Sequence, residues 1–110
     1  IGVNATVVRV PVFYGHSEAV HIETRDKLSA EQARELLERA PGVVVVDERV
    51  AGGSPTPVTH ASGSDAVYVG RIREDLSHPR ALNLWVVSDN IRKGAALNAV
   101  QIAELVASEG

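Results

Sequence analysis

The stretch Leu28–Val46, LSAEQARELLERAPGVVVV, joins a helix signal directly to a strand signal. Ser29 followed three residues later by Gln32 has the spacing of a capping box, which marks the start of a helix. Apolar residues then recur at helical intervals, at Ala33, Leu36, Leu37 and Ala40. Pro41-Gly42 is a stop signal. The wholly apolar run Val43–Val46 predicts a short strand that is covered on both faces.

Further strand signals flank this unit on both sides. They lie at residues 3–12, 19–24, 67–73 and 82–87, where β-branched or alternating apolar residues dominate. A second helix is predicted over Arg92–Val106, with a broad apolar face rich in small residues. Residues 47–63 contain Gly and Pro signals and read as a loop. The order β-β-α-β-β-β-α predicts one α+β domain over residues 1–110: a mixed, largely antiparallel sheet with helices on one face.

Composition excludes several function classes. The chain has 110 residues with a formal net charge of −3 and no basic stripe, so we expect no nucleic-acid partner. It has no cysteine, and therefore no disulfide, thiolate metal site or cysteine nucleophile of its own. Without an H-x-x-x-H spacing we expect no metal site, and the apolar runs are too short to span a bilayer. Because the sequence begins at Ile1 without Met, we expect a piece of a longer protein.

Two side chains in RVPVFYGHSEAV, Arg9 to Val20, are candidates for chemistry. Arg9 either faces solvent from an edge strand or acts as a planar fork that binds a carboxylate through two hydrogen bonds. His16 is either an ordinary loop residue or a general acid/base, since imidazole titrates near neutral pH. Gly15 would let the backbone bring the His16 ring close to a ligand.

The third candidate lies in SDNIRKGAALNAVQIAE, which begins at Ser88. A strand ends there and a helix follows, and such junctions favour ligands because free backbone N–H groups point outward. The simpler alternative is that Asp89 or Asn90 only caps the helix. No nucleotide-binding glycine motif is present, so this chain alone should not hold a pyrophosphate.

Three runs together resemble the C-terminal part of the aspartate-β-semialdehyde dehydrogenase family. They are RVPVFYGHSEAVHIET, VGRIRED and LNLWVVSDNIRKGAALNAVQIAELV. The spacing of Arg9 and His16, together with the closing D-N-x-R-K-G-A-A-x-N-x-x-Q-I-A-E block, carries the resemblance, which extends over essentially the whole chain.

This resemblance implies an NADP-dependent oxidoreductase that interconverts aspartyl phosphate and aspartate semialdehyde through a cysteine thioester. The reaction lies on the route to lysine, diaminopimelate, methionine and threonine. By position, His16 matches the acid/base histidine, Arg9 the arginine that binds the substrate carboxylate, and Asn90 an amide near the nicotinamide. The cysteine and the cofactor domain are not in this chain, so we expect it to be inactive alone.

The resemblance also implies partners and a place in the cell. The fold would be part of a glyceraldehyde-3-phosphate-dehydrogenase-like C-terminal domain, with residues 90–110 as a terminal helix that returns to the cofactor domain. We expect a homodimer or homotetramer in the cytoplasm. The alternative hypothesis is a non-catalytic dimerisation or interaction module with the same fold, in which Arg9 and His16 would have no chemical role.

Overall fold

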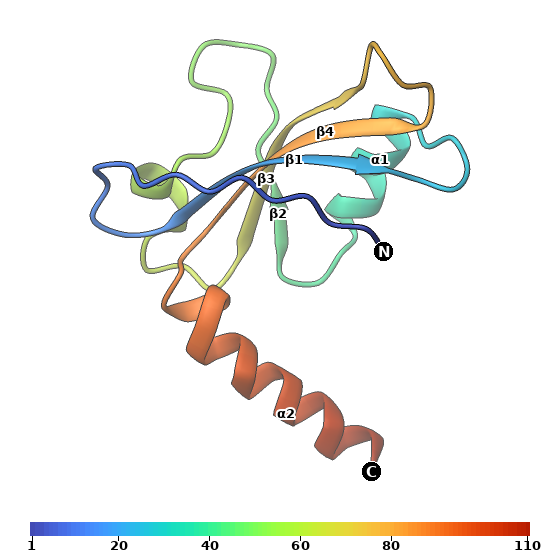
Figure 1. Cartoon of the computed structure of the whole chain (residues 1–110). Helices are drawn as coiled ribbons and strands as arrows, with labels where there is room; N and C mark the ends of the chain where they lie inside the picture. The colour runs from blue at the N-terminus through green and yellow to red at the C-terminus, as the bar shows by residue number, and fades with distance from the viewer.

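The computed structural model describes residues 1–110 and contains one sheet with four strands (Figure 1). The elements in chain order are β1 His16–Glu23, α1 Ala30–Glu38, β2 Val43–Val45, η1 Pro57–Ala61, β3 Val67–Glu74, β4 Ala81–Ser88, η2 Arg92–Ala96 and α2 Leu97–Glu109. The strand order is β1-β4-β3-β2, with antiparallel pairs β1–β4 and β3–β4 and a parallel pair β2–β3. The predicted α+β class and mixed, largely antiparallel sheet are therefore confirmed.

Helix α1 forms where the capping box predicts it. The Ser29 hydroxyl accepts the N–H of Gln32 at 3.1 Å, and the Gln32 side chain accepts the N–H of Ser29 at 3.0 Å. The helix packs on one face of the sheet over β2 and β3. Its Ala33 is buried there with three sheet residues, Val69, Ile72 and Leu82. The small core of the domain therefore lies between α1 and this face.

The loop between β2 and β3 covers part of the opposite face. The indole N–H of Trp85 donates to the backbone oxygen of Pro55 at 2.9 Å. Gly70 allows this close approach, because a Cβ there would lie 2.2 Å from the Val46 oxygen and 2.6 Å from Pro55 Cδ. The covering does not reach all of β2: the Val44 side chain is 42% exposed, so the prediction of a strand covered on both faces is wrong at that residue.

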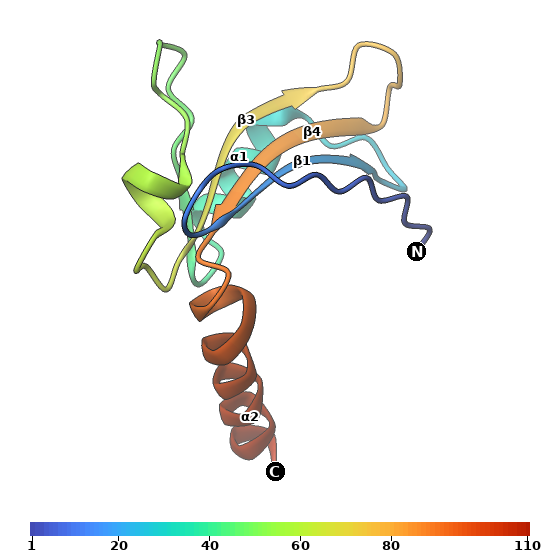
Figure 2. The same ribbon diagram turned by 60° about the vertical axis from the view of Figure 1, so that its left-hand side comes forward.

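The N-terminal segment, residues 1–15, forms no strand, and the prediction of one over residues 3–12 is wrong. Its only hydrogen bond between two backbone groups joins the Val12 N–H to the Val10 oxygen. Val3, Val7 and Val8 are 86%, 89% and 78% exposed. A β-branched run favours a strand only where a neighbouring strand supplies hydrogen bonds and packing. Here residues 1–12 lie beside β1 without pairing to it (Figures 1 and 2). The chain then turns at residues 13–15 and enters β1 at His16.

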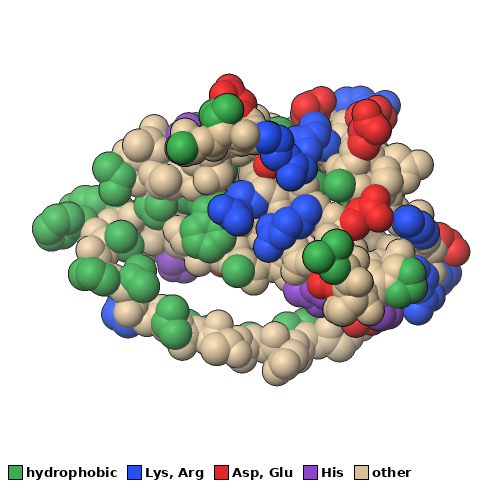
Figure 3. Space-filling view, turned by 90° about the horizontal axis from the view of Figure 1, so that it is seen from above, with side chains coloured by type: hydrophobic (Ala, Val, Ile, Leu, Met, Phe, Trp, Pro, Cys, Tyr) green, Lys and Arg blue, Asp and Glu red, His purple; other side chains and the backbone are tan.

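Helix α2 extends away from the sheet in both ribbon views (Figures 1 and 2). Together with η2 it confirms the helix predicted from Arg92, although its first turn is π-helical and it continues to Glu109. None of its residues is buried, and its apolar Val100, Ile102 and Leu105 are more than half exposed. Apolar side chains also lie open to solvent on the face drawn in Figure 3. No helix in the structure has both the length and the apolar character needed to cross a bilayer.

Candidate active site

His16 is the first residue of β1, three residues earlier than the strand start predicted from sequence. It pairs across the sheet with Ser88, the last residue of β4. The side chain is exposed, and its ring makes no hydrogen bond within the chain. Both ring nitrogens are therefore free to exchange a proton with a ligand or another side chain.

Asn90 contacts Gly15, the residue that precedes His16. The Asn90 Oδ1 accepts the backbone N–H of Gly15 at 2.9 Å, across 75 residues of sequence. Gly15 has a φ of 96°, which L side chains rarely adopt. A Cβ there would lie 2.8 Å from the Pro57 Cβ. The backbone at residue 15, immediately before His16, therefore requires glycine, and it lies between η1 and the end of β4.

Asp89 anchors the junction between β4 and η2. Its buried side chain is 6% exposed. One carboxylate oxygen accepts the N–H groups of Ile91 and Arg92 at 2.8 and 3.0 Å, and the other accepts the N–H of Gly63 at 2.8 Å. The hydrogen bonds from the Arg92 and Gly63 backbones hold the pKa of Asp89 below its ordinary value. Of the two residues considered as a helix cap, Asp89 satisfies the first-turn donors and Asn90 does not.

Arg9 lies in the unpaired N-terminal segment, and its guanidinium makes no hydrogen bond or ion pair in the chain. No hydrogen bond joins it to His16 or Asn90. The structure thus brings His16 and Asn90 together through Gly15, whereas Arg9 has no contact that ties it to this pair.

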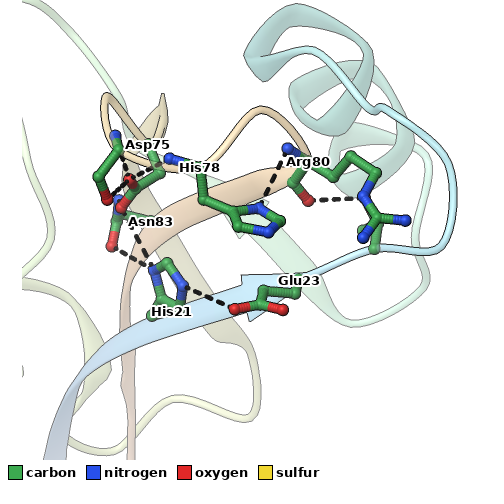
Figure 4. Close-up of polar contacts among 8 residues, drawn as sticks. His21, Glu23, Asp75, His78, Arg80 and Asn83 are labelled. Carbon is green, nitrogen blue, oxygen red and sulfur yellow. Dashed lines mark hydrogen bonds and ion pairs between the residues drawn. The ribbon is translucent and has the colours of Figure 1, made fainter.

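A second polar cluster occupies the opposite end of the β1–β4 pair, and sequence reasoning missed it (Figure 4). His21 pairs with Asn83 across the strands, and its Nδ1 lies 3.2 Å from Asn83 Oδ1 and 3.5 Å from Asp75 Oδ2. Asp75 also accepts hydrogen bonds from Ser77, His78 and Asn83. The hydroxyl of Ser77 and the amide of Asn83 hold the pKa of Asp75 well below its usual range. The D-x-S spacing of an Asx turn was the available sequence signal.

This second cluster is not arranged as a metal centre. No group of three or more His, Asp or Glu side chains in the structure is placed to hold a metal ion. Its contacts instead close the turn between β3 and β4. The end of the sheet with Gly15, His16 and Asn90 is the candidate active site.

Known proteins resemble this chain over nearly its full length. Residues 2–93 match the sequence profile of the semialdehyde dehydrogenase dimerisation domain. An aspartate-semialdehyde dehydrogenase of Legionella pneumophila is 62% identical over 109 residues, which are 99% of this chain and 31% of that protein. The enzyme of the same name from Aquifex aeolicus is 56% identical over 110 residues, or 100% of this chain and 32% of that protein.

Solved structures agree with the sequence relatives. Aspartate semialdehyde dehydrogenase II from Vibrio cholerae superposes with a TM-score of 0.82 at 55% identity, covering 90% of this chain and 29% of that one. A probable aspartate-semialdehyde dehydrogenase from Pseudomonas aeruginosa superposes with a TM-score of 0.77 at 42% identity, covering 87% and 28%. The chain thus spans about 31% of the length of the curated relatives it matches. It belongs to the semialdehyde dehydrogenase family, in the region of that family's dimerisation domain.

Proposed function

We propose that this chain is the part of an aspartate-semialdehyde dehydrogenase that supplies the acid/base histidine, His16, and the substrate-binding arginine, Arg9. The observation that supports this most strongly is the 62% identity over 99% of the chain to a protein of that name. A structure of the Vibrio cholerae relative was determined in complex with ASA. The whole enzyme would act in the cytoplasm on the route to lysine, diaminopimelate, methionine and threonine.

The reaction is the NADPH-dependent reduction of aspartyl phosphate to aspartate semialdehyde and phosphate, and its reverse. A cysteine from outside this chain would form the thioester. His16 would take the proton from that thiol, because only a thiolate is a good nucleophile, and would return a proton later in the cycle. The exposed imidazole, free of hydrogen bonds within the chain, is suited to this transfer.

Arg9 would bind the substrate carboxylate that does not react. A guanidinium offers five N–H donors in a planar fork that matches a carboxylate. All of these donors are unused within the chain, since the Arg9 side chain makes no bond here. Clamping one carboxylate would keep the other end of the substrate in position for attack.

NADP would be held mainly by the part of the protein outside this chain; in its reduced form, NADPH, it would supply the hydride for the reduction, and in the reverse reaction NADP would accept it. Asn90 fits a contribution to its binding, because the Asn90 amide nitrogen makes no hydrogen bond within the chain and can donate to a carboxamide oxygen. Residues 90–110 would carry the terminal helix back to the cofactor domain. The exposed apolar residues Val100, Ile102 and Leu105 of α2 are consistent with a covering partner of that kind.

Substitutions in the full-length protein test these roles. His16→Ala should lower kcat roughly 10²- to 10⁴-fold, the usual contribution of a general acid/base. Arg9→Leu should raise KM for the substrate about tenfold or more while kcat changes less, since charged hydrogen bonds to the bound substrate are lost. His78→Ala and Arg39→Leu are matched controls on the turn after β3 and on α1, and they should leave both constants near wild type. Full turnover by His16→Ala would contradict the acid/base role.

Dimerisation is a second proposed role, supported by the description of the matching profile as a dimerisation domain. We propose that the full-length protein is a homodimer or a homotetramer through this region. Sedimentation of the purified protein would measure its mass. A protein that assembles but has no turnover with aspartate semialdehyde, phosphate and NADP would favour the non-catalytic module over the enzyme.

A further inference from the structure

The contact between Gly15 and Asn90 sits where the β1–β4 ladder ends. The ladder pairs His16 with Ser88, so the next position would place Gly15 opposite Asp89. The Gly15 N–H instead bonds to the side chain of Asn90, at 2.9 Å. The hydrogen-bond acceptor for the backbone of Gly15, immediately before His16, is therefore a side chain.

The chemistry of this bond fixes the orientation of the amide. The backbone N–H of Gly15 can only donate, so the Asn90 atom that it meets must be the oxygen. The Asn90 nitrogen therefore points away and makes no hydrogen bond inside the chain. The Asn90 oxygen can therefore hold Gly15 while the Asn90 nitrogen remains available to donate to another group.

The surroundings make this contact rigid on both sides. Pro57 of η1 is buried, and it lies so close to Gly15 that a Cβ added to Gly15 would be 2.8 Å from the Pro57 Cβ. The neighbour of Asn90, Asp89, is held by three backbone N–H groups. Asn90 is therefore presented from a fixed strand end and not from a free loop.

We infer that Asn90 is a positioning residue for His16: its amide oxygen holds the Gly15 backbone and so places the imidazole that follows. His16 has no side-chain hydrogen bond of its own, so its ring position depends on its backbone. This inference rests on the proposed function for the role of His16 in catalysis. It differs from cofactor binding, which would use the amide nitrogen.

Two substitutions in the full-length protein separate the oxygen from the nitrogen. Asn90→Ala removes both, whereas Asn90→Asp keeps an acceptor oxygen in place and loses the N–H donors. Amide hydrogen exchange at Gly15 should become roughly fivefold faster in Asn90→Ala, as expected for one lost hydrogen bond. It should stay close to wild type in Asn90→Asp.

Steady-state kinetics measure whether the hydrogen bond between Gly15 and Asn90 affects turnover. With aspartate semialdehyde, phosphate and NADP, kcat of Asn90→Ala should fall roughly 10- to 100-fold, because a small misplacement of a reacting group is costly. Asn90→Asp should recover kcat to within about threefold of wild type, even if its KM for NADP rises. Asn83→Ala is the matched control: this asparagine of β4 contacts Asp75 and His21 at the far end of the sheet, and kcat and Gly15 exchange should not change.

Two results would overturn the inference. One is unchanged exchange at Gly15 in Asn90→Ala. The other is equal loss of kcat in the Ala and Asp variants, which would assign the role of Asn90 to its nitrogen. A wild-type protein without turnover would instead refute the proposed function, and the exchange measurement would still decide whether Asn90 holds Gly15.

Discussion

The carboxylate of Asp89 accepts the backbone N–H of Gly63 at 2.8 Å, which joins the loop after η1 to the end of β4. The same side chain holds the first N–H groups of the last helical segment. Three parts of the chain therefore meet at one buried carboxylate. Its neighbour, Asn90, holds the residue before His16.

Asp89→Ala should destabilise the domain strongly, because it leaves three backbone donors without their acceptor. We expect the thermal midpoint to fall by several degrees, with Asp89→Asn intermediate because one amide oxygen can still accept. Asp26→Ala, at an exposed aspartate whose side chain makes no hydrogen bond, is the control. Circular dichroism melting of the 110-residue chain measures the effect, and equal midpoints for the two alanine variants would refute the anchoring role.

Gly70→Ala should disrupt the packing of the loop over the sheet. A Cβ at this residue would lie 2.2 Å from the Val46 oxygen, which belongs to the backbone and cannot turn away. We expect a loss of about 1–3 kcal/mol in the free energy of unfolding, as for other overpacked positions. Gly2→Ala, where a Cβ meets nothing within 4 Å, is the control. Urea unfolding that shows no difference between the two would contradict the close contact.

Ser29→Ala should weaken helix α1 by removing the acceptor for the Gln32 N–H. The expected cost is about 1 kcal/mol of unfolding free energy, and Ser29→Asp should restore most of it because aspartate also caps helices well. Ser108→Ala on α2 is a control, since its hydroxyl only donates to a carbonyl within its own helix. Denaturant midpoints measure the stability of all three variants. A Ser29→Ala variant as stable as wild type would show that the capping box does not stabilise α1.

Asp75 should make stability depend on acid pH. Its folded pKa lies below the ordinary value of 3.8, so its contribution is present above that pH and is lost as pH falls toward the folded pKa. Asp75→Asn should therefore lower the melting temperature most at pH 5–7, and the gap from wild type should narrow below pH 3.8. Melting curves between neutral and acid pH test this, with Asp26→Asn as control. A gap that stays constant with pH would show that the Asp75 charge plays no part.

Local patterns in the sequence predicted α1, α2 and three strands well, whereas η1 Pro57–Ala61 lies within residues 47–63, where only a loop was predicted. The capping box of Ser29 and Gln32 and the apolar spacing after it involve residues within a few turns of one another, so their structure follows from local chemistry. In β3 the alternation of Val67, Tyr68 and Val69 likewise indicated that Val67 and Val69 share one side, which is the side of the core cluster. The resemblance of the RVPVFYGHSEAVHIET and LNLWVVSDNIRKGAALNAVQIAELV runs also led to the correct family.

The N-terminal segment shows where local reasoning fails. Val7, Val8 and Val10 have the residue type of a strand, yet a strand exists only when a partner strand supplies hydrogen bonds. In this chain the partner of β1 is β4, and nothing pairs with residues 3–12. The start of β1 at His16 and not at Ala19 has the same origin, because the pairing with Ser88 sets it.

The sequence by itself determined the α+β class, the cap of α1, the family and the candidates Arg9, His16 and Asn90. Only the tertiary structure decided that Asn90 meets Gly15, that Asp89 and not Asn90 serves the helix start, and that His21, Asp75 and Asn83 gather at the other end of the sheet. The physical reason is distance along the chain. Contacts between residues many positions apart depend on strand register and loop closure, which no local pattern of residues encodes.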